Sequence, residues 1–196
     1  MFPQKYLKYK PVYLAKGKRS IVYVFSKNNK KYFIKIKHPN SKAQNRLENE
    51  ATFLKILNKY KIGPKLIGYR KDFIVMEYIW GVQLIKYNKK NKDQIFVNNI
   101  LEQCFILDKL KINKEEMHKP LKHIFISKNK ITMIDFERCH YTDKPKNVTQ
   151  FVQFIQRMFH IENEKLKSLL RLYKHEQTKE NLDSIRKEIE KAIKQS

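Results

Sequence analysis

The sequence predicts an α+β fold with two lobes, the first mostly β and the second mostly helical. Segments rich in β-branched and aromatic residues are concentrated before residue 81, and apolar residues recur at helical spacing after it. A chain of 196 residues is long enough for one large domain or two small lobes. We therefore expect an N-terminal lobe over residues 1–81 and a C-terminal lobe over residues 82–196, with a ligand cleft between them.

The N-terminal lobe is expected to be a β-sheet with one helix. Its predicted strands span residues 12–14, 21–25, 32–36, 66–69 and 73–78. Asn28-Asn29 marks the turn between the second and third strands. A helix is predicted over residues 41–60 and ended by Gly63-Pro64. The apolar positions that indicate this helix are Leu47, Ala51 and Leu54.

The C-terminal lobe is expected to hold a long helix, a loop, a short hairpin and three further helices. Asp93 is the predicted N-cap of the long helix. The apolar stripe of this helix consists of Phe96, Ile100, Cys104 and Leu107. The loop covers residues 113–123, and the hairpin joins residues 124–127 to residues 131–136. The last three helices have apolar stripes that begin at Val148, Leu166 and Leu182.

The charge of the chain is strongly positive and unevenly distributed. Lys and Arg number 43 against 19 acidic residues, which gives a formal net charge of +24. No Asp or Glu occurs before Glu48, so the positive field belongs to the N-terminal part. Such a charge attracts polyanions, and nucleic acid or a phosphorylated ligand is a possible partner. The alternative is a generically basic, solvated surface.

Several classes of protein are excluded by composition. No apolar run approaches the roughly 20 residues that span a bilayer, so no membrane partner is expected. Only two cysteines are present, Cys104 and Cys139, which excludes a disulfide scaffold and makes a reducing cytoplasm the expected compartment. His118 and His123 lack an accompanying cysteine pair, so zinc is a weak interpretation.

Phosphoryl transfer requires a cover over the phosphates, a cation that binds them and acids that hold Mg²⁺. The turn over residues 15–22, Ala-Lys-Gly-Lys-Arg-Ser-Ile-Val, matches a degenerate glycine-rich loop. The positions that match this loop are Gly17, Ser20 and Val22. A plain basic hairpin turn is an equally good interpretation of this segment alone.

The cation is expected to be Lys35, in a Phe-Ile-Lys segment that resembles the lysine strand of protein kinases. Glu50, in the middle of the predicted helix, is the expected partner of Lys35. Glu48 is the alternative partner, but it lies on a different helix face. An outward-facing strand lysine is the structural alternative.

Two further segments resemble parts of the nucleotide site of kinases. Residues 74–79 resemble the strand that leads to the hinge, with Met76 as gatekeeper and the backbone of Glu77, Tyr78 and Ile79 hydrogen-bonded to adenine. A buried sheet edge is the alternative. Asp135 ends an apolar strand in Asp-Phe-Glu, where a kinase has Asp-Phe-Gly and holds Mg²⁺. A structural salt bridge is the alternative for Asp135.

With these motifs in this order, the chain resembles a small atypical protein kinase. It is similar to the lipopolysaccharide-kinase, RIO and Bud-type families, and to archaeal proteins predicted to be serine/threonine kinases. The motifs shared with the archaeal proteins read Pro120-Leu-Lys122-His123 and Asp135-Phe-Glu-Arg138. The resemblance covers about residues 10–160. It implies ATP and Mg²⁺ as cofactors and a hydroxyl group, of a protein or another molecule, as acceptor.

The catalytic loop departs from the kinase pattern His-Arg-Asp-x-x-x-x-Asn. In one register His118 takes the Asp position and His123 the Asn position, and in the other Pro120 takes the Asp position. An imidazole accepts a proton at neutral pH, a neutral His123 is a candidate metal ligand beside Asp135, and Lys122 is placed to neutralise a phosphoryl group. No Ala-Pro-Glu sequence follows, so no long activation segment is expected.

Three hypotheses follow from the sequence. The first is an ATP- and Mg²⁺-dependent phosphotransferase with Asp135, His118, Lys122 and His123 as catalytic residues. The second is a nucleotide-binding pseudokinase that acts as a scaffold or switch. The third is an RNA- or ribosome-binding protein that uses the acid-free N-terminal segment, which rests on charge alone.

Overall fold

The chain divides into two compact units. The first unit comprises residues 1–80 and 132–138, and the second comprises residues 81–131 and 139–196. This computed structural model describes residues 2–195 except 44, 88–93 and 129. Residues 132–138 thus belong to the first unit, although the proposed division of the sequence into residues 1–81 and 82–196 assigns them to the C-terminal lobe.

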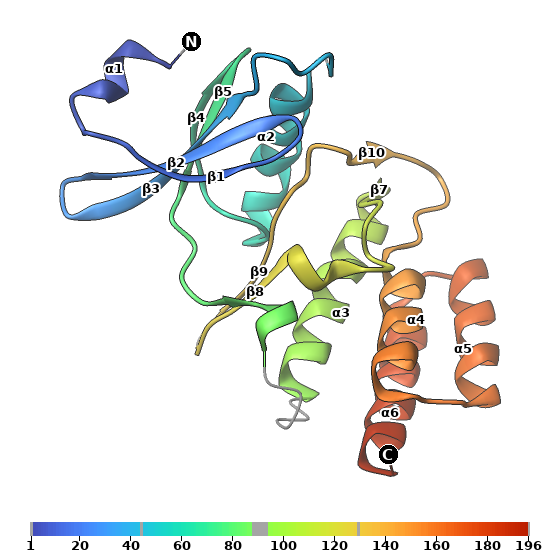
Figure 1. Ribbon diagram of the computed structural model, residues 1–196. Helices are drawn as coiled ribbons and strands as arrows, with labels where there is room; N and C mark the ends of the chain where they lie inside the picture. The colour runs from blue at the N-terminus through green and yellow to red at the C-terminus, as the bar shows by residue number, and fades with distance from the viewer. Residues whose placement is uncertain (1, 44, 88–93, 129, 196) are drawn as a thin grey trace. The chain divides into compact units, whose positions relative to one another are not determined.

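A five-stranded antiparallel sheet forms the centre of the first unit (Figure 1). In spatial order its strands are β1 (Val12–Lys16), β2 (Ser20–Lys27), β3 (Lys30–Lys37), β5 (Phe73–Glu77) and β4 (Leu66–Arg70). The predicted strands are all present. Asn28 and Asn29 both have left-handed φ angles, 50° and 59°, which suit the tight turn between β2 and β3.

The two faces of this sheet bury different kinds of side chain. Phe25, Ile34 and Ile36 form an apolar cluster with Phe73 and Val75 on one face. Aromatic residues at and beside the short helix α1 (Gln4–Leu7) pack against that cluster. Because side chains alternate along a strand, Lys35 points to the opposite face, the one that α2 (Arg46–Leu57) covers.

The helix α2 begins later than the sequence predicts. It starts at Arg46 rather than residue 41, and it continues after Leu57 as the 3₁₀ helix η1 (Asn58–Tyr60). The Ser41 hydroxyl accepts a hydrogen bond from the N–H of Ala43 at 3.3 Å, and Asn45 has a left-handed φ of 56°. Serine and asparagine favour such local bonds and turns over the helix, and the predicted helix is therefore wrong at the described residues 41–43 and 45.

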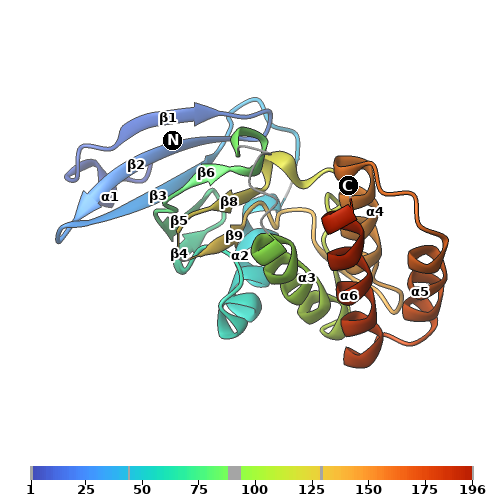
Figure 2. The ribbon, with the colours of Figure 1, turned by 90° about the horizontal axis from the view of Figure 1, so that it is seen from below.

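The second unit is mostly helical. Its helices are α3 (Gln94–Lys109), α4 (Asn147–Phe159), α5 (Glu164–His175) and α6 (Lys179–Gln195), as the sequence predicts. Asp93, the predicted cap of α3, lies outside the described residues. Helix α3 packs against α4 and α6, and α5 packs against α6 (Figures 1 and 2). None of the described helices has the length and apolar character that crossing a bilayer requires.

Short strands and single helical turns connect these helices. β6 (Val82–Gln83) pairs with β8 (Ile124–Ile126), and β7 (Ile112–Asn113) pairs with β10 (His140–Tyr141). The helical turns are η2 (Leu84–Lys86) and η3 (Pro120–Lys122). β9 is shorter than predicted, Ile131–Met133 instead of residues 131–136, because the chain turns at Asp135 with a φ of 65°.

A buried polar cluster ties α3 to α4 and α5. Asp108 has no exposed surface, and its carboxylate accepts hydrogen bonds from the Asn147 backbone and side chain at 3.0 and 2.7 Å. It also accepts from the N–H of Val148 at 3.2 Å and from the Tyr173 hydroxyl at 3.0 Å. We call this group the Asp108 cluster. Every donor in it is electrically neutral.

Candidate functional site

Lys35 lies at the centre of a group of acidic side chains in the first unit. Its ammonium nitrogen is 2.9 Å from Glu50 Oε2, 3.3 Å from Glu137 Oε2 and 3.5 Å from Asp135 Oδ1. The side chain of Lys35 is 13% exposed. We call Lys35, Glu50, Asp135 and Glu137 the Lys35 cluster. Residues from β3, from α2 and from the segment after β9 thus meet at one ammonium group.

Glu50 is held from two directions. It is on the buried face of α2, with a side chain only 3% exposed, and it accepts the bond from Lys35. Its second oxygen, Oε1, lies 3.4 Å from the backbone nitrogen of Phe136, which donates to it. Glu48, the alternative partner considered from the sequence, is only half-buried and lies outside the cluster. The helix therefore presents Glu50, rather than Glu48, to Lys35.

The turn that places Asp135 is fixed by its neighbour. Asp135 adopts a left-handed φ of 65°, a conformation that Asp tolerates better than most residues. Phe136 then turns into the core, where it is fully buried beside Leu54 and Gly63. A Cβ on Gly63 would lie 2.9 Å from the Phe136 ring, so only glycine leaves room for this contact.

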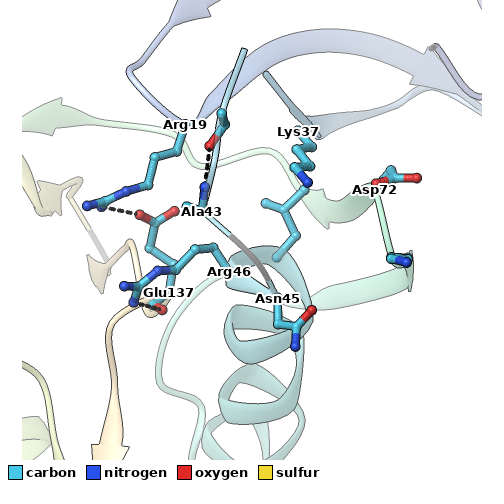
Figure 3. Close-up of a pocket in the computed structure, with 10 residues that line it drawn as sticks. Arg19, Lys37, Ala43, Asn45, Arg46, Asp72 and Glu137 are labelled. Atoms are coloured by element: carbon cyan, nitrogen blue, oxygen red, sulfur yellow. Dashed lines mark hydrogen bonds and ion pairs between the residues drawn. The ribbon is translucent and has the colours of Figure 1, made fainter. Parts of the chain in front are cut away.

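Glu137 is part of the cluster. From the sequence it was noted only because it stands where kinases have the glycine of Asp-Phe-Gly. Its Oε1 accepts a hydrogen bond from Arg19 Nη1 at 2.9 Å (Figure 3). Its Oε2 lies 3.3 Å from the ammonium nitrogen of Lys35. The backbone carbonyl of Glu137 accepts from Arg46 at 3.3 Å and from Asn49 at 3.0 Å. The signal in the sequence was a carboxylate two positions after a strand-ending aspartate.

The electrostatics of the cluster favour a permanently charged lysine. Burial by itself would lower the pKa of Lys35, but the charges of Glu50, Asp135 and Glu137 outweigh burial and hold that pKa well above its usual value. Burial raises the pKa of Glu50, and the ammonium of Lys35 opposes this shift. The cluster with Arg19 contains one more carboxylate than cation. The excess negative charge suits a further cation.

The acidic side chains of the cluster fit a hard metal ion such as Mg²⁺. Ligand oxygens of Glu50, Asp135 and Glu137 lie within 4.8 Å of one another, and Mg²⁺ prefers carboxylate oxygen. Asp135 is the most accessible of them, at 30% side-chain exposure against 3% for Glu50 and 7% for Glu137. Asp135 is therefore the carboxylate of the cluster that a cation from solvent reaches most easily.

The turn between β1 and β2 is closed by its own backbone. The N–H of Gly17 donates to the carbonyl of Ser20 at 2.8 Å, Ser20 is buried and Val22 is half-buried. Arg19, from the same turn, donates a hydrogen bond to the carboxylate of Glu137. The turn is thus joined to the Lys35 cluster through Arg19.

The segment after β5 has the hydrogen-bonding pattern of a strand end. Met76 is buried, and the N–H groups of Glu77 and Tyr78 donate to the carbonyls of Lys65 and Lys31. Tyr78 also stacks on Phe33, with ring centroids 4.6 Å apart. Among the described residues, none accepts a backbone hydrogen bond from the N–H of Ile79.

The predicted catalytic loop lies in the second unit. The exposed His118 is fixed by its backbone, whose carbonyl accepts from Arg157 at 2.6 Å, and Lys122 is also exposed. His123 is half-buried, with Nε2 3.4 Å from Glu116 Oε2. The structure therefore joins Lys35, Glu50 and Asp135, and it assigns the three loop residues to the other unit.

Comparison with known proteins identifies the fold. The sequence matches no protein-family model and no curated protein sequence. The structure is similar to that of Rio2 kinase from Chaetomium thermophilum in an ADP/Mg²⁺-phosphoaspartate complex, with a TM-score of 0.63 and 13% identity over 97% of this chain and 74% of that one. A second Rio2 kinase structure from Chaetomium thermophilum gives 0.59 and 15%, over 97% and 76%.

A third similar structure is WaaP in complex with acyl carrier protein, with a TM-score of 0.60 and 13% identity. The match covers 96% of this chain and 91% of that one. These comparisons confirm the predicted α+β, protein-kinase-like fold with a small helical C-terminal part. At identities of 13–15%, these similarities establish the fold only.

Proposed function

We propose that this chain is an ATP- and Mg²⁺-dependent phosphotransferase of the atypical serine/threonine protein-kinase type. The observation that carries the proposal is the contact of Lys35 with both Glu50 and Asp135, at 2.9 and 3.5 Å. A strand lysine paired with a helix glutamate beside a strand-ending aspartate is the set that binds phosphates and metal in kinases. A structural neighbour in complex with ADP and Mg²⁺ supports this nucleotide chemistry.

The residues of the cluster take distinct roles in this proposal. Lys35 binds the phosphates of ATP, and Glu50 holds the lysine in position. Asp135 binds the metal ion, which neutralises charge on the phosphates when it is present. The backbone around Gly17, Ser20 and Val22 covers the phosphates, and the segment with Met76, Glu77 and Tyr78 lies beside adenine.

The transfer step places the γ-phosphoryl group on an acceptor hydroxyl. A bond forms between the acceptor oxygen and the γ-phosphorus, the bond from that phosphorus to the β,γ-bridging oxygen breaks, and ADP leaves. The hydroxyl proton passes to an imidazole, for which His118 and His123 are the candidates. Glu116, 3.4 Å from His123, is placed to orient that ring. Lys122 is proposed to neutralise the phosphoryl group in transit.

Replacement of Asp135 by asparagine tests the proposal most directly. We expect Asp135→Asn to lose at least about 100-fold in phosphate transfer from labelled ATP, because the amide cannot neutralise the metal. The matched control is Asp143→Asn, a charge loss at an exposed position of the second unit, which should leave transfer unchanged. Equal turnover in wild type and Asp135→Asn would contradict the proposed function.

A nucleotide-binding pseudokinase is the second candidate. It is favoured by the absence of a carboxylate at either register of the catalytic loop, where His118 or Pro120 stands. In that case Mg²⁺ and ATP raise the melting temperature without turnover, because a ligand that binds the folded state but not the unfolded state stabilises the folded state. Loss of the ATP-induced shift in Lys35→Met, together with no transfer by wild type, would select this candidate.

A further inference from the structure

A small cavity in the first unit has Glu137 in its wall, whereas Lys35 does not line it. It has a volume of about 250 Å³, and segments far apart in sequence line it (Figure 3). These are the end of the β1–β2 turn, the end of β3, residues 41, 43 and 45 before α2, the first two residues of α2, the β4–β5 turn, and Glu137. Drug-sized ligands occupy about 300–1,000 Å³, so the cavity suits a smaller molecule or a single functional group.

The lining of the cavity is mainly cationic. Arg19, Lys37, Arg46 and Lys71 contribute four positive charges, against the carboxylates of Asp72 and Glu137. Glu137 already binds Lys35 and Arg19, so it cannot balance the remaining cations. No carboxylate among the described residues lies within salt-bridge distance of Lys37 or Lys71. The cavity therefore has an excess of positive charge within a confined space, which an anion would relieve.

The start of α2 adds backbone donors to the same cavity. Asn45, Arg46 and Leu47 line it, and the first N–H groups of a helix have no partners within the helix. Asn45 has a left-handed φ of 56°, and its side chain makes no capping bond to a described residue. A helix N-terminus favours an anion, and here it acts together with side-chain cations from separate segments.

We propose that this cavity binds a phosphate dianion, either inorganic phosphate or the phosphoryl group of a small ester. Arg46 and Arg19 supply planar guanidinium groups that match phosphate oxygens, and Lys37 and Lys71 supply point charges. Arg46 Nη1 lies 3.3 Å from the carbonyl of Glu137 and Arg19 Nη1 lies 2.9 Å from its carboxylate, so both are held at the cavity wall before a ligand arrives. This cavity shares Arg19 and Glu137 with the surroundings of the Lys35 cluster, but Lys35, Glu50 and Asp135 do not line it.

The test is calorimetric titration of inorganic phosphate into the full chain at constant ionic strength. We expect saturable binding to wild type and about tenfold weaker binding to Arg46→Gln and to Lys71→Gln. Lys71 is exposed, so its variant folds even if Arg46→Gln does not. The matched control is Lys59→Gln, an exposed cation of the same unit outside the cavity, which should bind as wild type does.

Two further arms separate this cavity from the nucleotide site and identify the form of phosphate that it binds. Lys35→Met should keep most of the phosphate binding, because Lys35 does not line the cavity and acts on it only through its contact with Glu137. Loss of binding in Lys35→Met with retention in Lys71→Gln would assign the phosphate to the nucleotide site and overturn the proposal. Titration of phosphoserine then distinguishes inorganic phosphate from a phosphate ester as the ligand. Binding of either compound with the predicted pattern among the variants supports the proposed site. If neither compound binds, the proposal is overturned.

Discussion

The Lys35 cluster and the Asp108 cluster both place carboxylates inside the protein, but they neutralise them differently. Asp108 has no exposed surface and is surrounded by neutral donors from Asn147, Val148 and Tyr173. Burial raises the pKa of Asp108, and these hydrogen bonds oppose the shift. In the Lys35 cluster, by contrast, three carboxylates surround one ammonium group, and one of them, Asp135, is 30% exposed.

This difference separates a structural network from a functional one. A fully hydrogen-bonded network locks the elements that carry it, and here it joins α3 to α4 and α5. A group with surplus charge and partial access to water retains the capacity to bind an ion or a phosphate. The comparison therefore indicates that the Asp108 cluster contributes chiefly to stability, and it supports the proposal that the Lys35 cluster binds a ligand.

Asp108→Asn should have the largest effect on stability. The amide keeps one acceptor oxygen but turns an NH₂ group toward donors of Asn147 or Tyr173, which leaves buried polar groups unpaired. We expect the free energy of unfolding to fall by about 2–4 kcal/mol in urea denaturation. Asp143→Asn, at an exposed position, should change it by less than about 0.5 kcal/mol. A loss no greater than that control would remove the structural role assigned to Asp108.

Lys35→Met should have an intermediate effect that grows with pH. Without the ammonium, burial and the neighbouring carboxylates raise the pKa of Glu50 further. The folded state then binds protons that the unfolded state has released, so the free energy of unfolding falls as pH rises from about 5 to 8. We expect a loss of about 2 kcal/mol at the upper end, because partial exposure of Asp135 moderates the repulsion.

The pH dependence of Lys35→Met distinguishes the contribution of the lysine's charge to stability from the contribution of its packing. Urea denaturation of Lys35→Met at several pH values should show a steeper decline than wild type. Lys30→Met, at the exposed start of β3, is the matched control and should follow the wild-type curve. A pH-independent loss in Lys35→Met would mean that the lysine contributes packing rather than charge, and the functional assignment of the cluster would lose its electrostatic basis.

Most of the fold follows from local patterns in the sequence. The alternation of apolar residues around Lys35 predicts β3, and the stripe that includes Cys104 and Leu107 predicts α3. Boundaries were harder to predict because side chains compete with the backbone for hydrogen bonds. Ser41 forms a local turn where a helix was expected, and the left-handed turn at Asp135 follows the early end of β9.

The candidate site was predictable in part. Lys35 lies within β3, Glu50 lies within α2 and Asp135 lies two residues after β9, so the order of these elements along the chain predicts the three residues. The contact of Arg19 with Glu137 joins residues 118 positions apart, and no local pattern indicates it. Asp108 was missed because a single aspartate on a helix usually indicates a solvated face, whereas here it follows Leu107 on a buried face.

Glu137→Gln should have the smallest effect on stability of the three variants. Its result decides whether the Lys35 cluster, like the Asp108 cluster, is a structural network. Glu50 and Asp135 still neutralise Lys35 in this variant, and Arg19 is 42% exposed and becomes hydrated when its partner weakens. We therefore expect a loss below about 1 kcal/mol in urea denaturation, close to that of Glu77→Gln, which breaks a 3.7 Å pair with Lys65 in the same unit. A loss as large as that of Asp108→Asn would mean that the Lys35 cluster, too, is primarily a structural network, whereas a small loss leaves its surplus charge to ligand binding.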